Sequence, residues 1–400
     1  LGTFAYRVNA NAVTELNLLG NLGDASYRKT GDLYGIILLP ESATSADIES
    51  ARRLLIDRGA ADGVSGTLME RYFSGRQDIV NFNHIDTSNV TQMWACFLGC
   101  SNVVSYPLMD TSLITSMGYA FQSNNSLESF PAIQAPVCSD FQNAWQSCSA
   151  LTSFPADAKL GTEANNVNFT SAWQQSGLTS FPALDLSTGN SFHNAFNGCS
   201  ALTSFPSGAK LGTAATGVDF SGAWRSSGLT SFSTPLPTAG SLVASWRDCS
   251  SMTSFSVAEL PLATDSRQSF LNCDFSTFST EIPKSKAFQY CWSGCSSLTD
   301  FSADVLANWN PVSLYDSVFD EAWNNCTSLT AQSVENILVS IDASGKYATT
   351  TGASGGPALT DAGIDIDYNV ATGSLSAATN AAVTSLKSKG WVIVVNGVTL

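Results

Sequence analysis

The histidines are the first side chains to consider for catalysis, and the chain has only two, His84 and His193. Neither lies in a motif that arranges a serine or cysteine nucleophile, and neither HExxH nor a phosphate-binding loop occurs. Hydrolysis and phosphoryl transfer depend on such arrangements of residues. The sequence therefore predicts a protein that is not an enzyme, with no catalytic residues and no cofactor.

The ten cysteines allow three interpretations: a disulfide framework, a metal site or a set of buried thiols. The pairs Cys96/Cys100 and Cys291/Cys295 have the tightest spacing for zinc, but neither has a second pair or a histidine in metal spacing nearby. Seven cysteines occupy one position of a repeated phrase, and this register favours buried thiols that act as small apolar side chains. The seven are Cys100, Cys148, Cys199, Cys249, Cys273, Cys295 and Cys326.

Carboxylates and tryptophans suggest two kinds of binding site. Asp361, Asp365 and Asp367 resemble part of a calcium loop, but the EF-hand spacing and its closing glutamate are missing. A solvated acidic turn and edge strand are therefore expected there. Exposed indoles could stack on sugar rings, but most tryptophans begin a repeat and are expected in the core. The three outside that position, and so the candidates for exposure, are Trp94, Trp309 and Trp391.

The composition excludes two classes of partner. Only 13% of the residues are charged, against about 25% in ordinary soluble domains. A net charge of −15 argues against a nucleic-acid-binding surface, which needs a basic stripe. No apolar run approaches the roughly 20 residues of a membrane-spanning helix. We expect no nucleic acid partner and no insertion into a membrane.

An internal repeat dominates the middle of the chain. Its phrase is aromatic-x-x-Cys-x-x-Leu-Thr-Ser-Phe-Pro, with clear copies at residues 145–155 and 196–206. Copies follow each other after 22 to 31 residues, a period typical of leucine-rich repeats. Residues 148–173 also recur 51 residues later, as expected for a duplicated two-repeat block. The leading aromatic residues are Phe97, Phe121, Trp145, Trp173, Phe196, Trp224, Trp246, Phe270, Trp292 and Trp323.

Each repeat is interpreted as one coil of a solenoid. Leu151 and Phe154 are expected to point into the coil from a short strand, with Ser153 and Pro155 facing outward. The leading aromatic residue begins a tight turn or short helix on the opposite side and places its ring in the core. One coil cannot bury that ring alone, so neighbouring coils must cover it.

The repeated phrase resembles the BspA-like leucine-rich repeats of bacterial surface proteins, whose units carry Ala-Phe-x-x-Cys-x-x-Leu. Residues 86–93 and 110–117 are similar to the Asp-x-Ser-x-Val-Thr-x-Met phrase of related repeats in mycoplasma-type lipoproteins and many bacteriophage proteins. The resemblance covers about residues 82–330. The segments around residues 333–338 and 386–391 are similar to those attached to repeat regions in phage virion proteins, and residues 11–17 and 33–42 have the same character.

We therefore expect a leucine-rich-repeat solenoid of about ten coils with short parallel strands and a small α/β cap at each end. The predicted division is an N-terminal α/β cap or assembly domain at 1–81, the solenoid at 82–330 and a C-terminal α/β cap at 331–400. Helices are expected at 44–58, 331–342 and 376–389, with strands at 32–40 and 391–395.

The resemblance implies a non-enzymatic structural protein exposed on a bacteriophage virion, as a tail fibre or capsid decoration that takes part in host attachment. Its expected partners are other virion proteins and a protein or glycan receptor on the host surface, and it is expected to form a homo-oligomer. The alternative is a bacterial cell-surface adhesin. A glycan-active enzyme is a third hypothesis, which requires paired carboxylates in a cleft. The predicted sheet face carries mainly Ser, Thr and Pro, so the longer connections at 155–173 and 301–323 are the expected binding regions.

Overall fold

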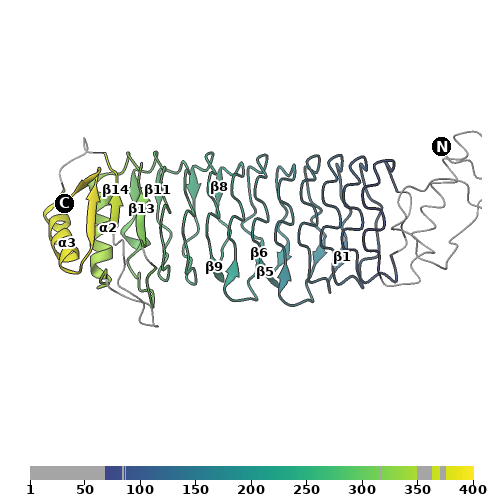
Figure 1. Cartoon of the computed structure of the whole chain (residues 1–400), viewed down its shortest axis with the longest axis horizontal. Helices are drawn as coiled ribbons and strands as arrows, with labels where there is room; N and C mark the ends of the chain where they lie inside the picture. The colour runs from purple at the N-terminus through teal and green to yellow at the C-terminus, as the bar shows by residue number, and fades with distance from the viewer. Residues whose placement is uncertain (1–67, 83–84, 86, 316, 349–362, 370–374) are drawn as a thin grey trace, which may run out of the picture.

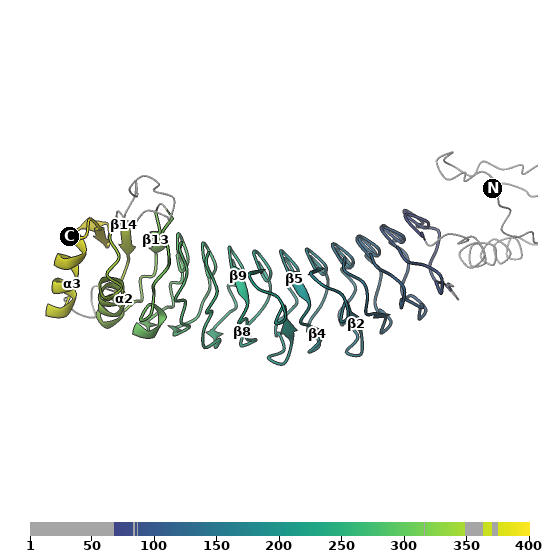
Figure 2. The ribbon, with the colours of Figure 1, turned by 90° about the horizontal axis from the view of Figure 1, so that it is seen from below.

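The computed structural model describes residues 68–82, 85, 87–315, 317–348, 363–369 and 375–400. These residues form a solenoid of short parallel strands, with two helices and a small sheet at its C-terminal end (Figure 1). The solenoid is elongated and gently curved, with β5, β9 and β13 toward the inner side of the curve and β2, β4 and β8 toward the outer side (Figure 2). No helix among the described residues is long and apolar enough to cross a membrane.

Parallel pairing between successive coils forms three ladders. The inner ladder joins four strands and continues as single bridges, for example Leu68 to Gln92 and Ser241 to Asp265. Two outer ladders pair strands of two residues each, and the inner strands have two or three, because the chain turns again at once. The inner strands are β3 (Val167–Asn168), β5 (Gly189–Ser191), β7 (Val218–Asp219) and β9 (Ala239–Ser241). The outer strands are β1 (Gln134–Ala135), β2 (Lys159–Leu160), β4 (Asp185–Leu186), β6 (Lys210–Leu211), β8 (Ser231–Phe232), β10 (Ser254–Phe255), β11 (Thr277–Phe278) and β12 (Asp300–Phe301).

The leading aromatic residue of each repeat, here called the anchor ring, lies in a compact turn. The residues two before and two after it have positive φ, for example Asn143 at 56° and Ser147 at 59° around Trp145. This conformation points successive backbone groups at the next coil, so the Trp145 amide donates to the carbonyl of Ala172 at 2.7 Å. Non-glycine residues adopt it at a small steric cost. The many hydrogen bonds between coils offset this cost.

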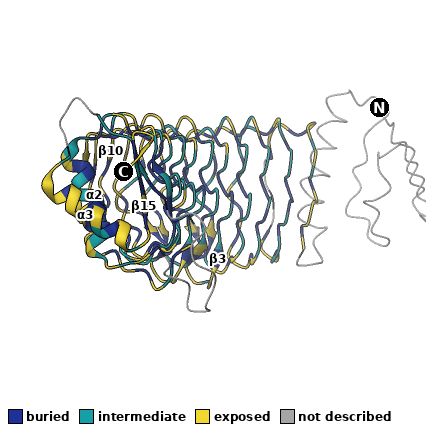
Figure 3. Ribbon diagram, turned by 60° about the vertical axis from the view of Figure 1, so that its left-hand side comes forward, coloured by how far each residue is buried: buried dark blue, intermediate teal, exposed yellow. Residues whose placement is uncertain are grey.

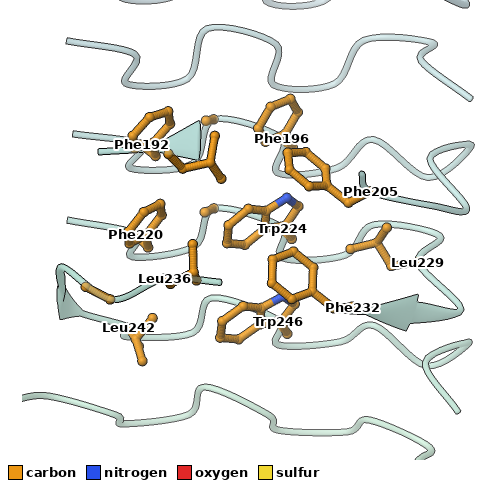
Figure 4. Packing of buried hydrophobic residues seen from close by; sticks show 14 of the residues in the cluster. Phe192, Phe196, Phe205, Phe220, Trp224, Leu229, Phe232, Leu236, Leu242 and Trp246 are labelled. Atoms are coloured by element: carbon orange, nitrogen blue, oxygen red, sulfur yellow. The ribbon is translucent and has the colours of Figure 1, made fainter. Parts of the chain in front are cut away.

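The anchor rings form one continuous column through the core. Consecutive rings are nearly parallel, as for Trp145 and Trp173, whose centroids lie 5.5 Å apart at 8°. A second column holds the phenylalanines of the Leu-Thr-Ser-Phe phrase and meets the anchor rings edge to face, as Phe154 meets Trp145 at 78°. Figure 4 shows both columns around Trp224, with Phe220 and Phe192 in a third. Leu151 and Phe154 are buried as expected.

All ten cysteines are buried free thiols, in agreement with the favoured interpretation. The seven at the repeat position share one contact, in which Sγ donates to the carbonyl of the anchor ring one coil earlier. Cys249 donates in this way to Trp224 at 3.0 Å, and Cys273 to Trp246 at 3.2 Å. At two repeats without cysteine, Ser176 and Ser227 occupy the position. At these seven repeats the thiol therefore ties its coil to the one before it.

The solenoid extends further toward the N-terminus than the predicted boundary at residue 82. Phe73 stacks on Phe97 with centroids 5.3 Å apart at 5°, and the Met69 amide donates to the Gln92 carbonyl at 2.8 Å. Residues 68–82 thus form one more coil. The repeat phrase hides it because Arg76 stands where the cysteine is expected. The helix expected at 44–58 and the strand at 32–40 lie outside the described residues.

The C-terminal end is an α/β unit. The helices expected at 331–342 and 376–389 are α2 (Ala331–Ala343) and α3 (Ala377–Ser388), which begin after the N-caps Thr330 and Ser376. Each has a buried and an exposed side in Figure 3. A short 3₁₀ helix, η2 (Ala303–Val305), precedes them. The sheet has the order β13 (Phe319–Trp323), β14 (Gly363–Ile366), β15 (Val392–Val395) and β16 (Val398–Thr399).

Candidate functional site

The inner side of the curve is built from the turns that carry the anchor rings. We call the solvent-facing side chains between five residues before and two residues after each anchor ring the inner face. The anchors and the small residues next to them are buried, while the neighbouring positions are half-buried or exposed. These positions vary from coil to coil because the core places no demand on them. The scaffold is therefore regular and the inner face is not.

In several coils an Asp or Asn side chain on the inner ladder shapes the start of the turn. The Asp140 Oδ1 accepts from the amide of Gln142 at 3.0 Å, and Asp219 Oδ1 accepts from Ser221 at 2.9 Å. Asn168 makes the same contact with Thr170. Short polar side chains favour this local bond. These carboxylates are thus engaged in holding the turn, and the repeat phrase quoted from the sequence does not include this position.

The N-terminal part of the inner face carries aromatic side chains. The Trp94 indole is half-buried, has the Arg71 guanidinium carbon 4.6 Å above its ring centroid and meets the Tyr119 ring edge to face at 5.6 Å. A Cβ on Gly118 would lie 3.0 Å from the indole and 2.8 Å from the Asp140 carboxylate. The indole fits because this position has no side chain.

Amide side chains form a column in the next coils. Gln122 Nε2 donates to Gln146 Oε1 at 2.5 Å, and Gln146 Nε2 donates to Gln174 Oε1 at 3.0 Å. Gln142 Nε2 donates to the Tyr119 hydroxyl at 3.1 Å. Such planar groups donate and accept at once, and exposed amides can bind hydroxyl or amide groups of a ligand.

A cluster of arginine and carboxylate groups follows. Asp248 accepts from Arg247 Nε at 3.2 Å and from Asn272 Nδ2 at 2.8 Å, and Arg247 also donates to Gln268 Oε1 at 2.7 Å. Arg225 Nε lies 3.9 Å from the same Asp248 carboxylate. The inner face thus passes from aromatic to amide to charged side chains along the solenoid.

The tryptophans expected at the surface divide into two groups. Trp94 is on the inner face, but Trp309 and Trp391 are buried, which corrects the expectation for those two. The Trp309 Nε1 donates to the Ser285 carbonyl at 2.8 Å, and Trp391 Nε1 donates to the Lys346 carbonyl at 3.0 Å. Both indoles fill the space where the solenoid meets the C-terminal unit, so their function is packing.

The other candidates are dispersed. His193 lies on the inner face with Nδ1 3.7 Å from Asp219, and His84 lies outside the described residues. Asp365 in β14 and Asp367 just after it accept from the amides of Glu321 in β13 and Asn325 just after that strand. Since β14 lies between β13 and β15, it is not the edge strand expected from the sequence. Asp361 lies outside the described residues. Among the residues that the structure describes, no group of three or more His, Cys, Asp or Glu could hold a metal ion.

The outward Ser and Thr positions, such as Thr152 and Ser153, lie on the outer side of the solenoid. Several of these threonines donate to the coil before, as Thr179 does to the Thr152 carbonyl at 3.2 Å. Their hydroxyls therefore stabilise stacking. From the sequence, binding was expected at the connections 155–173 and 301–323 instead of this face, and the inner face was not recognised. The signal was present in the variable residues that flank each anchor ring.

The chain matches no protein family model, and no curated protein matches it. Among solved structures, the chain is similar to a leucine-rich repeat protein from Bacteroides ovatus. The identity is 14% over 60% of this chain and 81% of that chain, with a TM-score of 0.21. This likeness is too slight to bear on function.

Proposed function

We propose that this protein is a non-enzymatic attachment protein of the leucine-rich-repeat type, whose inner face binds a receptor on a host cell. The observation that carries the proposal is the contrast between a repeated core and a varied polar inner face. A solenoid with extended concave surfaces is suited to bind large partners in this way. The variation from coil to coil supplies specificity, while the stacked rings supply rigidity.

The setting proposed is the surface of a bacteriophage virion, as a tail fibre or a capsid decoration. The support is the resemblance of the repeats and end segments to virion proteins. Other virion proteins and a protein or glycan receptor are the partners in this proposal, and virion proteins of this kind assemble as homo-oligomers. The alternative is a bacterial cell-surface adhesin of the BspA-like type, which would use the same face.

The test uses the purified chain and candidate host cells. Fluorescently labelled protein is expected to bind host cells and to block infection by the phage, while a variant with Gln142, Gln146 and Gln174 changed to alanine binds less. A matched variant with Thr152, Thr203 and Ser254 on the outer side changed to alanine is expected to bind normally. Equal binding by both variants would contradict the inner face as the receptor site.

Immunogold labelling locates the protein. Gold on phage particles is expected for a virion protein, and gold on the bacterial envelope of uninfected cells supports the adhesin. Labelling of neither surface would contradict both settings.

A further inference from the structure

Two arginines occupy the same inner-face position in consecutive coils. Arg225 and Arg247 each follow an anchor ring, Trp224 and Trp246, whose centroids lie 5.3 Å apart at 6°. The two side chains therefore leave the backbone side by side. Asp248 is the carboxylate that approaches both guanidinium groups, at 3.2 Å from Arg247 Nε and 3.9 Å from Arg225 Nε.

The contact of Arg225 is longer than a hydrogen bond. Within the described part of the chain its guanidinium makes no side-chain hydrogen bond, and its side chain is 40% exposed. Arg225, Arg247 and Asp248 together carry one net positive charge, and the inner face of the same and the next turn also carries Asp219 and the ion pair of Asp265 with Arg267. The two guanidinium groups lie beside the same carboxylate and repel each other, in a chain whose net charge is −15. An anionic ligand would relieve this repulsion.

The fold does not require arginine at this position. Equivalent residues in other coils are neutral: Gln146, Gln174 and Asn197 follow the anchor rings Trp145, Trp173 and Phe196. A neutral coil and an arginine coil stack through the same backbone hydrogen bond: Trp173 donates to the Ala195 carbonyl at 2.9 Å, and Trp224 donates to the Ser245 carbonyl at 2.8 Å. The charge at Arg225 and Arg247 is therefore available for recognition.

We propose that Arg225 and Arg247 bind the acid groups of an anionic polysaccharide. This inference deepens the proposed attachment function by naming the ligand class of the same face. Guanidinium groups bind carboxylate, sulfate and phosphate groups through paired hydrogen bonds. The neighbouring Gln268 and Asn272 amides add groups that can bind sugar hydroxyls.

A protein ligand fits this part of the inner face less well. Protein interfaces draw most of their affinity from buried aromatic and apolar anchors. No large apolar side chain between residues 138 and 311, a stretch that the structure describes completely, is exposed. A polar ligand that offers hydroxyl and acid groups, and little apolar surface, is the better match.

The test measures binding of the full chain to immobilised polysaccharides by biolayer interferometry. Oligogalacturonate and dextran sulfate supply carboxylate and sulfate groups, and neutral dextran supplies neither. We expect binding to at least one acidic polymer, weaker at higher salt because the charges are screened, and no binding to dextran. Arg225→Gln and Arg247→Gln are each expected to weaken binding about tenfold. The acidic polymer with higher affinity identifies the acid group.

Lys210→Gln is the matched control. It also removes one positive charge, but Lys210 lies outside the inner face and pairs with Asp185 at 2.8 Å. This variant is expected to bind like the wild type. Circular dichroism melts verify that all variants are folded, as expected because glutamine follows Trp145 and Trp173 naturally.

Three results would overturn the proposal: binding to neither acidic polymer, equal loss in Lys210→Gln and Arg225→Gln, or equally tight binding to polyglutamate, which would indicate an acidic peptide ligand. Failure of this proposal can be distinguished from failure of the proposed attachment function. If cells bind the wild type and the arginine variants equally, the attachment function stands and this inference fails. If the protein binds acidic polysaccharide but not host cells, this inference stands and the attachment function fails.

Discussion

The Sγ of Cys148 donates to the carbonyl oxygen of Phe121, the anchor ring of the preceding coil, at 3.2 Å. Burial raises the pKa of the Cys148 thiol to about 12, and that of Cys295 to about 12 as well. The thiols are therefore protonated donors at neutral pH. They contribute to the stacking of coils as small side chains that also satisfy a carbonyl group.

The protein is expected to lose stability in mild alkali. In the unfolded chain a thiol ionises near pH 8.5, whereas burial raises the pKa of Cys199 and Cys249 to about 11 in the native state. Unfolding therefore releases protons above about pH 8.5, and the free energy of unfolding falls by up to about 1.4 kcal/mol per pH unit for each thiol. The stabilisation is complete below pH 8.5 and is lost as the pH rises toward the native pKa.

Urea unfolding between pH 7 and pH 10 in the presence of a reductant measures this slope. The control is Cys148→Ser, which keeps a donor at a position that serine occupies naturally at Ser176 and Ser227. Because this variant has one thiol fewer, its free energy of unfolding is expected to fall less steeply with pH than that of the wild type. A stability that does not change up to pH 10 would show that the thiols are not buried in this way.

Replacing an anchor tryptophan by phenylalanine is expected to cost little. Among the residues that the structure describes, the Nε1 of Trp224 has no hydrogen-bond partner, and Phe196 holds the same position one coil earlier. Trp224→Phe should lower the free energy of unfolding by about 1–2 kcal/mol, and Trp224→Ala by about 3–5 kcal/mol because it leaves a cavity. Denaturant unfolding followed by circular dichroism measures both.

Trp309→Phe is the informative comparison. It makes the same exchange of an indole for a phenyl ring, but it also leaves the Ser285 carbonyl without its donor. A buried acceptor left unsatisfied costs about 1–3 kcal/mol, so this variant should be less stable than Trp224→Phe. Equal costs for the two variants would mean that the indole hydrogen bond contributes nothing.

Gly177 is expected to tolerate no side chain. A Cβ at this position would lie 2.1 Å from the carbonyl oxygen of Ser149, which is a backbone atom of the preceding coil and has little freedom to move. Gly177→Ala should therefore separate the two coils and destabilise the protein by several kcal/mol, on the order of 3. The thermal midpoint measures the effect.

Gly208→Ala is the control for this prediction. Its Cβ would meet only the Cβ of Ala183 at 3.7 Å, an ordinary contact, and its backbone has no positive φ. It should be neutral or slightly stabilising because alanine has less conformational freedom in the unfolded chain. If Gly177→Ala and Gly208→Ala have the same thermal midpoint, the two coils do not approach each other as closely at Gly177 as the structure shows.

Ser266 interrupts an otherwise apolar column. It lies four residues before Phe270, where Leu242 and Phe288 precede the adjacent anchor rings, and its buried Oγ has no partner among the described residues. Ser266→Ala removes this unsatisfied hydroxyl and should raise stability by about 0.5–1.5 kcal/mol. Differential scanning calorimetry of the variant provides the measurement.

The nearby Ser269 provides the opposite case. Its buried Oγ donates to the Leu242 carbonyl at 2.7 Å. Ser269→Ala should therefore destabilise the protein by about 1 kcal/mol or more. A loss of stability in Ser266→Ala as large as in Ser269→Ala would indicate that the Ser266 hydroxyl is in fact bonded.

The repeat phrase predicted the core positions that it contains. The spacing of Trp145, Cys148, Leu151 and Phe154 identified which side chains point inward, and all four are buried. The coil at Phe73 was missed because Arg76 replaces the cysteine that marked the other repeats. Trp309 and Trp391 were misplaced because the repeat pattern applies only within the solenoid, and these rings pack where it meets the C-terminal unit.

The sequence by itself determined that this chain is a solenoid. Aromatic residues recur every 22 to 31 residues, and such short units can bury their rings only by stacking on one another. Only the tertiary structure decided which polar residues share a surface. Arg225, Arg247 and Gln268 are 21 to 43 residues apart along the chain, and they share one surface because each coil returns to the same place beside the last. The direction of their side chains depends on positive φ values at non-glycine residues such as Ser226 and Asp248. Local sequence does not specify that conformation, and the hydrogen bonds between coils impose it.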